Sequence, residues 1–232
     1  MSKFTFAQRP EGFDTHIENS IRGYNNLVTD IIDISNYFVD DGSIVVDIGC
    51  STGKLLKQML LKNEHANNVQ YIGVEVESDF YHVFDDDSLI ERSNNCLLEY
   101  HRCDIRQYEF PKNTSLITSV FTLQFMPEND RQYVIQRIYD SLRFGGAFIF
   151  AEKTISTSAK IHEIRTFTYY DYKRKTFDSD DILNKEAQLR HMLKPTTREY
   201  LINACRAAGF SLCEIDSFWQ NHAFTGFIAI KN

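Results

Sequence analysis

The sequence predicts an α/β fold built on a mostly parallel sheet. Short apolar runs rich in Val and Ile recur along the 232 residues and alternate with stretches of helical periodicity. A parallel sheet covered on both faces produces this alternation, because its strands are buried on both sides and helices connect them. Hydrophobic residues make up 43% of the chain and charged residues 25%, so we expect one globular domain, residues 1–232, and exclude a disordered chain.

Helical periodicity comes first along the chain. Apolar residues recur at three- and four-residue spacing from Ile17 to Ile34, which predicts an amphipathic helical region ending near Phe38. We expect this N-terminal helical cap, residues 1–40, to pack across the sheet edge or the site.

The expected strands alternate with helices and end in a hairpin. Strands are predicted at 43–49, 69–75, 96–103, 115–121 and 147–153, with 211–220 and 223–232 closing the sheet as an antiparallel pair. Helices are predicted at 52–62, 78–92, 130–143 and 196–209, the second of them broken by the acidic run 85–87. Gly145 and Gly146 are expected to form the C-cap of the helix 130–143.

Residues 154–195 are predicted to form a helical lid. The stretch from Ser158 to Met192 is helical in pattern, polar and rich in tyrosine. Its polarity argues against a place in the core and favours an insertion that covers the strand ends.

Composition excludes several classes of protein. The formal charge of −7 opposes general attraction to nucleic acid or anionic lipid, so neither is expected as a partner. The five cysteines are scattered and form no CxxC pair, which argues against a metal site and favours a reducing cytoplasm. No run approaches the roughly 18 apolar residues of a membrane span.

The strongest local motif is the turn after the first strand. Residues 47–53 read DIGCSTG and lie where a buried strand passes into a helix, which is the ligand crevice of an open α/β sheet. Gly49 and Gly53 let the backbone approach a ligand, and the helix offers free N–H groups. The spacing matches neither a P-loop nor GxGxxG, so triphosphate binding has little support.

This D-x-G-x-x-x-G pattern resembles motif I of class I S-adenosylmethionine-dependent methyltransferases, beginning at Asp47. Two later acids strengthen the likeness. Glu75 ends the second strand, where a carboxylate can accept the hydroxyl hydrogens of a ribose. Asp104 and Ile105 follow the third strand, where the methyltransferase pattern implies an acceptor for the adenine amino group beside an apolar residue that covers the ring.

The likeness extends further to one branch, the carboxy-S-adenosylmethionine synthases, which make a carboxylated cofactor from S-adenosylmethionine and prephenate for tRNA wobble-uridine modification. The segments that carry it are 13–24, 47–53, 103–106, 121–125, 143–153, 171–174, 207–210 and 219–224. This resemblance implies a Rossmann-like fold with a seven-stranded sheet and a homodimer formed through the lid helices. The cofactor contacts that it implies are Tyr24, Gly49, Cys50, Ser51, Glu75, Asp104 and Ile105, and we also expect Asp47, Gly53, Val76 and Val120 among the cofactor-binding residues.

Two departures from the family bear on the reaction. Val120 stands where the family has a cofactor-contacting Asn, and valine can neither donate nor accept a hydrogen bond. An ungapped alignment puts Glu186 where the family has the arginine that pairs with the added carboxylate, which reverses the sign of the interaction. A gapped alignment brings Arg190 into that role instead. The ungapped alignment points toward plain S-adenosylmethionine.

We therefore expect a methyltransferase acting on a small molecule, with S-adenosylmethionine as cofactor and S-adenosylhomocysteine as product. No catalytic residue is assigned; His222, Tyr169 and Tyr170 are candidate bases by placement only. Basic residues of the lid, with Arg174 foremost, could attract an anionic acceptor. The alternatives are carboxy-S-adenosylmethionine synthesis and a non-catalytic module that binds the cofactor. A nucleic-acid base methyltransferase is disfavoured because no DPPY-like tetrad follows the fourth strand.

Overall fold

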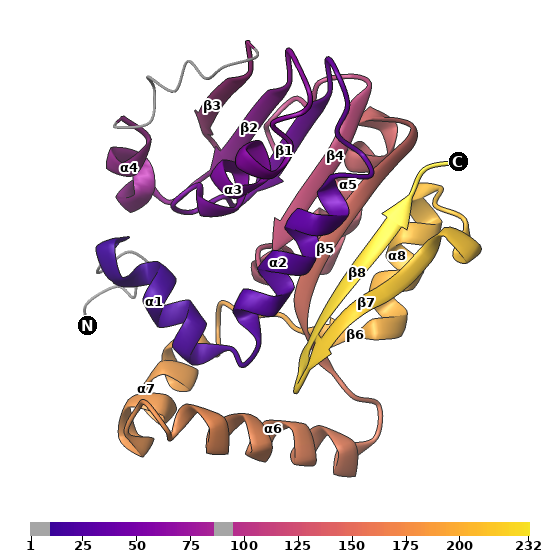
Figure 1. Ribbon diagram of the computed structural model, residues 1–232. Coiled ribbons are helices and arrows are strands. Elements are labelled where there is room, and N and C mark those ends of the chain that lie inside the picture. The colour runs from indigo at the N-terminus through magenta and orange to yellow at the C-terminus, as the bar shows by residue number, and fades with distance from the viewer. Residues whose placement is uncertain (1–9, 86–94) are drawn as a thin grey trace.

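The computed structural model describes residues 10–85 and 95–232 (Figure 1). Its centre is a sheet in the order β3-β2-β1-β4-β5-β8-β7. The strands are β1 (Ile44–Ile48), β2 (Gln70–Glu75), β3 (Leu97–Arg102), β4 (Thr114–Val120), β5 (Leu142–Ile155), β7 (Ile215–Asn221) and β8 (Phe224–Ile230). The first five pair in parallel, whereas β8 runs antiparallel to both β5 and β7. The predicted α/β fold, with a mostly parallel sheet and an antiparallel C-terminal strand, is confirmed.

Helices cover both faces of this sheet, as predicted. They are α1 (Pro10–Ser20), α2 (Tyr24–Ser35), α3 (Lys54–Lys62), α4 (Tyr81–Asp85), α5 (Glu128–Ser141), α6 (Ala159–Lys173), α7 (Ser179–Leu189) and α8 (Arg198–Ala208), with short 3₁₀ turns η1 (Ser78–Phe80), η2 (Leu123–Phe125) and η3 (Leu212–Glu214). The predicted helix 78–92 corresponds to η1 and α4 as far as residue 85; its remainder, and most of the acidic run 85–87, lies outside the described residues.

Alternating side chains of β1 build the two halves of the core. Val45 packs into one apolar cluster with Leu27 of α2 and Met59 of α3. Val46 points to the opposite face, where its cluster includes Ile135 of α5 and Cys205 of α8. Because successive side chains of a strand point to opposite faces of the sheet, one pair of helices packs on each face. This packing fixes the carboxyl ends of β1, β2 and β4 at one edge.

The N-terminal cap consists of two helices where the sequence predicted one region. Helix α1 ends at Ser20, and Gly23, at φ +75°, is the N-cap of α2, whose buried residues pack into the core on one face of the sheet. A left-handed backbone is easily adopted by glycine alone, so the chain turns here. Helix α1 lies instead across the carboxyl ends of the strands (Figure 1).

The prediction that Gly145 and Gly146 cap α5 is wrong. Helix α5 ends at Ser141, and β5 begins directly at Leu142 in extended conformation. Both glycines lie inside β5, where its register with β4 shifts between Thr114 and Leu116. A side chain on Gly146 would press on the Thr114 carbonyl at 3.0 Å, so glycine is required by close strand approach rather than by a helix end.

The predicted lid is a helical insertion tied at its base. The α6–α7 segment, residues 156–195, leaves the sheet after Ile155 and returns as the two-residue strand β6 (Thr196–Thr197), which pairs with Thr154 and Ile155. Buried Arg131 donates to the carbonyls of Met126 and Lys194 and thereby fixes the returning chain to the end of β4. The prediction that the polarity of this segment keeps it out of the core does not hold for Tyr169, whose side chain is buried.

None of the helices within residues 10–85 and 95–232 is long and apolar enough to cross a membrane.

Candidate functional site

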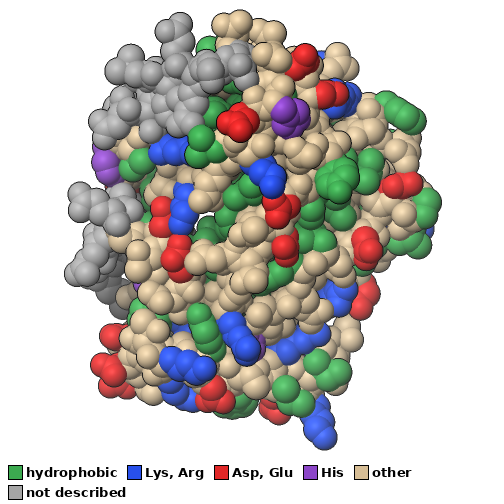
Figure 2. Space-filling view, viewed as in Figure 1, with side chains coloured by type: hydrophobic (Ala, Val, Ile, Leu, Met, Phe, Trp, Pro, Cys, Tyr) green, Lys and Arg blue, Asp and Glu red, His purple; other side chains and the backbone are tan. Residues whose placement is uncertain are grey.

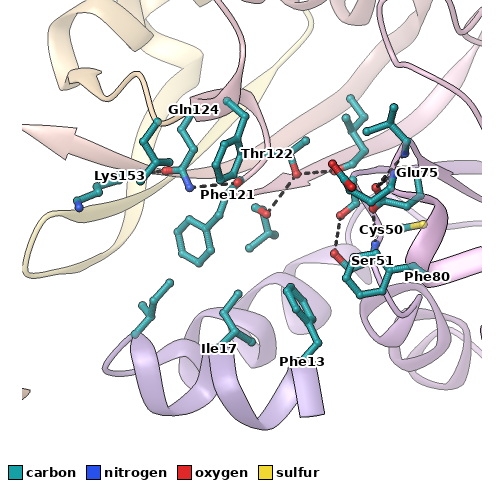
Figure 3. A pocket seen from close by; sticks show the side chains of 18 of the residues that line it. Phe13, Ile17, Cys50, Ser51, Glu75, Phe80, Phe121, Thr122, Gln124 and Lys153 are labelled. Carbon is teal, nitrogen blue, oxygen red and sulfur yellow. Dashed lines mark hydrogen bonds between the residues drawn. The ribbon is translucent and has the colours of Figure 1, made fainter. Parts of the chain in front are cut away.

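A cavity of about 400 Å³ lies at the carboxyl ends of β1, β2 and β4. The strand ends and the turns that follow them form one wall, and α1 forms the opposite wall (Figure 3). Glu75 lies at one end of this space and Lys153 at the other, with the ring of Phe121 between them. The cavity is elongated and its two ends differ in charge, so it can orient an extended ligand.

The β1–α3 turn forms the floor at the Glu75 end. Gly49 and Gly53 have φ of +69° and +70°, and the amide of Gly49 donates to the Val74 carbonyl at 2.8 Å. A β-carbon on Gly49 would collide with Thr122, whose hydroxyl donates to the Ile48 carbonyl at 3.1 Å. Backbone therefore faces the cavity here, as the motif predicted.

Glu75 is a carboxylate held in place by three backbone N–H groups. Its carboxylate accepts the backbone N–H groups of Ser51, Val76 and Glu77 at 2.8 to 2.9 Å. The side chain is buried, and burial raises its pKa. Because a carboxylate has about four lone-pair sites, Glu75 keeps capacity for a ligand hydroxyl while its position is fixed by the turn.

Asp47 and Tyr24 both line the cavity, and the charge of Asp47 acts on the phenol of Tyr24. Asp47 accepts the Thr118 hydroxyl at 2.6 Å, and burial raises its pKa to about 7. Burial together with the charges of Asp14 and Asp47 raises the pKa of Tyr24, so the phenol stays protonated. A cation would be favoured in this acid-lined space.

The residues after β3 line the side of the cavity. Ile105 is buried, and Asp104 is held by a bidentate contact from Arg106, whose Nε lies 3.0 Å from the carboxylate and lowers its pKa. Val76 and Val120 also line the cavity and present apolar surface. The carboxylate of Asp104 is thus oriented before any ligand arrives.

Helix α1 closes the cavity, in line with the expectation that the N-terminal helical cap packs across the sheet edge or the site; the sequence did not predict which contacts hold it there. Phe13 packs edge-on against Phe80 with ring centroids 5.0 Å apart. Glu18 pairs with Lys54 at 2.8 Å, joining α1 to the start of α3. The signal that could have revealed the contact is a pair of aromatic residues, Phe13 within the N-terminal helical cap and Phe80 after β2.

The Lys153 end of the cavity is basic. Lys153, Lys173 and Lys185 line it together with Glu186, which lies 3.6 Å from Lys153 and 3.8 Å from Lys173. Burial lowers the pKa of Lys173, and burial and the neighbouring Lys173 lower that of Lys185 to about 8. His16 of α1 contacts Lys185, and burial lowers the pKa of this imidazole to about 4.

Most of the predicted site residues line the cavity: Tyr24, Asp47, Gly49, Cys50, Ser51, Glu75, Val76, Asp104, Ile105, Val120 and Glu186. Gly53 and Tyr170 are not part of this lining. Gly53 shapes the turn, where Tyr100 fills the space of a β-carbon. Tyr169 lines the cavity and Tyr170 does not.

The remaining predicted substrate residues lie outside the cavity lining. Arg174 is exposed and pairs with Asp171 at 2.9 Å, and Arg190 is exposed just after α7. His222 lies in the β7–β8 turn, at 3.1 Å from the Thr168 hydroxyl. The gapped alignment that would bring Arg190 to the cofactor is thus unsupported by the geometry, whereas Glu186 of the ungapped alignment lies in the cavity.

Comparisons with known proteins agree with this arrangement. Residues 45–146 match the family of methyltransferase domains. The carboxy-S-adenosyl-L-methionine synthase of Staphylococcus epidermidis is 33% identical over 98% of this chain and 96% of its own, and that of Nautilia profundicola is 30% identical over 94% and 90%. Haemonchus contortus phosphoethanolamine N-methyltransferase 2, solved with phosphomonomethylethanolamine and S-adenosylhomocysteine, has a TM-score of 0.67 at 15% identity, over 99% of this chain and 59% of that one.

The fold and the site define a class I S-adenosylmethionine-dependent transferase, an enzyme with S-adenosylmethionine as its cofactor. Within that class, the chain belongs to the carboxy-S-adenosyl-L-methionine synthase family.

Proposed function

We propose that the enzyme transfers the methyl group of S-adenosylmethionine to a small acceptor bound between Phe121 and the α6–α7 segment. The observation that carries the proposal is the position of Glu186. This carboxylate lies inside the cavity beside Lys153 and Lys173, where the family resemblance implies an arginine that pairs with the carboxylate of the modified cofactor. A carboxylate there opposes a carboxylated cofactor and tolerates an unmodified one.

The residues at the Glu75 end fit the cofactor. S-adenosylmethionine presents an ammonium group, a sulfonium, a ribose diol and an adenine, and when bound it supplies an electrophilic methyl group. We assign Glu75 to the ribose, Asp104 to the adenine amino group and Ile105 to the adenine ring. The backbone of Gly49, Cys50 and Ser51 would approach the amino-acid portion, in the acid-lined space between Asp47 and Tyr24.

For methyl transfer, the protein has chiefly to align the acceptor with the methyl group and to exclude water. Helix α1 covers the cavity through the contact of Phe13 with Phe80, and the rings of Phe121 and Tyr169 give the other end an apolar surface. These residues would press the acceptor toward the methyl group and keep solvent out. No residue is assigned as a base, and the proton of the acceptor leaves with solvent or with a nearby amine.

Carboxy-S-adenosylmethionine synthesis is the second candidate. The full-length match to synthases of that name supports it, and so do the lysines beside Glu186, which could hold a carboxylate despite the missing arginine. On this reading the apolar side chain of Val120 is tolerated by the carboxylated cofactor.

Mass spectrometry of the small molecule that copurifies with the protein separates the two candidates. Unmodified S-adenosylmethionine or S-adenosylhomocysteine, and no conversion of S-adenosylmethionine on addition of prephenate, is the expected result. Prephenate-dependent formation of the carboxylated cofactor would overturn the methyltransferase proposal in favour of the synthase.

We further propose that residues 1–232 act as one domain, capped by 1–40 and 154–195, in a cytoplasmic homodimer that binds no nucleic acid directly. Exposed apolar residues on α6, Ile161, Ile164 and Phe167, support an interface there, because apolar side chains at this spacing form one stripe on a helix. The acidic charge of −7 supports the absence of nucleic acid. Light scattering of the purified protein tests the dimer.

A further inference from the structure

The turn after β4 contains a residue in an unfavourable backbone conformation. Phe121, the first residue of the segment 121–125, has φ +59°. A left-handed backbone is sterically costly for any residue with a β-carbon, and it is exceptional for a bulky side chain. Such strain persists only where the surroundings enforce it, and it is found most often at functional sites. Phe121 is buried and lines the cavity, so the strained residue belongs to the site itself.

Hydrogen bonds on both sides of the Phe121 α-carbon enforce this conformation. The Phe121 N–H donates to the Ala151 carbonyl at 2.7 Å, and its carbonyl accepts the side-chain amide of Gln124 at 3.1 Å. The side-chain carbonyl of Gln124 accepts the Lys153 N–H at 2.8 Å. Gln124 is buried, and both ends of its amide are bonded. One side chain therefore connects the backbone of Phe121 to β5.

Two buried charged side chains hold the middle of the same turn. The carboxylate of Glu152 accepts the Leu123 N–H at 3.0 Å, and Arg131 donates its Nε–H to the Leu123 carbonyl at 3.1 Å. Glu152 is 2% exposed and Arg131 1%, and neither lines the cavity. Because buried polar groups need partners, a turn that is bonded from both sides has little freedom to relax.

The ring of Phe121 lies in the middle of the cavity, between Glu75 and Lys153 (Figure 3). Its centroid is 6.3 Å from that of the Tyr24 ring, and the two planes are inclined at 35°. The sulfur of S-adenosylmethionine is bonded to the methylene group of the ribose. With the ribose on Glu75, the sulfur therefore falls on the side of these two rings.

The charges around the cavity favour a cation on the Glu75 side of the Phe121 ring. Asp47 and Glu75 line that end. Figure 2 shows Lys and Arg side chains gathered over the lower part of the molecule, where α6 and α7 lie, and these disfavour a cation at the other end. A sulfonium, like a quaternary ammonium, has no N–H or O–H group to donate, and an aromatic ring is a partner that stabilises such a cation.

We propose that Phe121 is a specificity-determining residue that distinguishes the charged sulfonium of S-adenosylmethionine from the neutral thioether of S-adenosylhomocysteine, and that Gln124 and Glu152 are positioning residues that hold its strained backbone. The inference rests on the proposed function in that the ribose of the cofactor binds Glu75. When the methyl group leaves, the electron pair of the S–CH₃ bond stays on sulfur and the positive charge disappears. The ring then no longer favours the bound ligand, and S-adenosylhomocysteine dissociates more readily.

Three ligands separate the charge from the methyl group. S-adenosylmethionine carries both, S-adenosylhomocysteine carries neither, and the carbon analogue in which a C–H group bearing the methyl replaces the sulfonium carries the methyl alone. Calorimetry on the full-length protein measures each dissociation constant. Phe121→Leu is expected to weaken S-adenosylmethionine about fivefold or more relative to both neutral ligands, because a desolvated cation loses its aromatic partner. Equal weakening of all three would overturn the proposal.

Phe13→Leu is the matched control among the rings of the cavity. Phe13 lines the cavity and packs against Phe80, the turn residue that follows β2. This ring covers the portion that the three ligands share. The substitution is expected to weaken them alike, and a loss confined to S-adenosylmethionine would assign the sulfonium to Phe13 instead of Phe121.

The strain at Phe121 is tested without ligand. Phe121→Gly and Phe121→Ala both remove the ring, but glycine alone adopts a left-handed backbone without steric cost. The glycine variant is therefore expected to unfold at the higher urea concentration, although glycine elsewhere destabilises a chain relative to alanine. A higher midpoint for the alanine variant would overturn the part of the proposal that concerns a strained backbone.

Gln124→Met tests the positioning role, since methionine keeps the length of the side chain and loses both hydrogen bonds. It is expected to lower the preference for S-adenosylmethionine as Phe121→Leu does, and to add nothing in a protein that already carries Phe121→Leu. Glu152→Leu should lower the preference too, whereas Glu152→Gln, which keeps an acceptor for the Leu123 N–H, should retain it. An additive effect of Gln124→Met would show that Gln124 does not act through Phe121.

The wild-type protein must first bind the cofactor. If it binds neither S-adenosylmethionine nor S-adenosylhomocysteine, the proposed function itself fails. If it binds both and Phe121→Leu leaves the ratio of their affinities unchanged, Phe121 does not recognise the sulfonium, while the proposed function stands. Should Glu152→Leu fail to fold, Gln124→Met and the Phe121 variants still decide between these outcomes.

Discussion

Thr122 occupies the place that a side chain on Gly49 would need. The methyl carbon of Thr122 lies 2.7 Å from the position of a β-carbon on Gly49, and its hydroxyl donates to the Ile48 carbonyl at 3.1 Å. The end of β4 is thereby locked against the turn after β1. The same contact holds the two strand ends that form the floor of the cavity.

The first prediction concerns this lock. Gly49→Ala should lower the free energy of unfolding by about 2 to 4 kcal/mol, because it combines a left-handed backbone with overpacking against Thr122. Gly145→Ala is the matched control, since Gly145 has φ +74° and open space around it. Urea denaturation should show the smaller loss for the control. A Gly49→Ala, Thr122→Ala double variant should recover part of the difference, and equal losses in the two single variants would contradict the steric explanation.

The second prediction concerns Glu75. Glu75→Gln should weaken S-adenosylhomocysteine binding at least tenfold, because an amide nitrogen cannot accept one of the three backbone N–H groups that the carboxylate holds. The turn at Ser51 should loosen as a result. Calorimetric titration measures the effect, and Glu109→Gln, which changes an exposed residue, provides the control. Unchanged affinity would remove Glu75 from the cofactor site.

The third prediction concerns pH. Burial raises the pKa of Asp47 to about 7, so between pH 4 and 7 the folded protein holds a proton that the unfolded chain has already released. The stability of the ligand-free protein should therefore fall as pH rises through this window, with Glu75, whose pKa is also raised, acting in the same direction. Asp47→Asn should flatten the decline and raise the melting temperature at pH 8 by about 3 °C or more. Thermal scans of this variant and of the exposed Asp216→Asn control check it; equal slopes would refute the assignment.

The fourth prediction concerns α1. Phe13→Ala should raise the dissociation rate of S-adenosylhomocysteine about tenfold and also lower the melting temperature of the ligand-free protein. Phe13 packs against Phe80, a buried member of the core, and also lines the cavity, so the substitution removes an apolar contact of the core as well as part of the cover over the ligand. Stopped-flow release measures the rate. Phe144→Ala, at an 80% exposed residue, should leave it unchanged, and an unaltered rate in Phe13→Ala would show that α1 does not retain the ligand.

The sequence predicted the positions of those elements that depend on the local pattern of apolar residues. The strands β1 and β4 are buried on both faces and read as continuous apolar runs, so their positions were predictable within a residue or two. The glycines at 49 and 53 and the acid at 104 follow strand ends, Glu75 is the last residue of β2, and the parallel sheet brings these segments to one edge. Glu75 and Asp104 were therefore predictable as neighbours of one cavity.

The rest depends on contacts between distant segments. Helix α1 crosses the strand ends because Phe13 meets Phe80 and Glu18 meets Lys54, and no local pattern encodes those pairs. Likewise, the lysines at 153, 173 and 185 belong to three elements whose convergence depends on how α6 and α7 fold back. Arg174, adjacent in sequence to Lys173, points to the surface, which shows that proximity along the chain was a poor guide here.

At the base of the α6–α7 segment, the end of β5 pairs with β6, so this segment can vary independently of the sheet. Residues 154 and 155 pair with 196 and 197, and Arg131 clamps the returning chain, so the segment enters and leaves at adjacent points. Forty residues between them can change in length or sequence while the strands that carry Glu75 and Asp104 keep their register. Acceptor preference in such an enzyme can therefore change through substitutions or length changes in the α6–α7 segment, while the residues at the cofactor end stay the same.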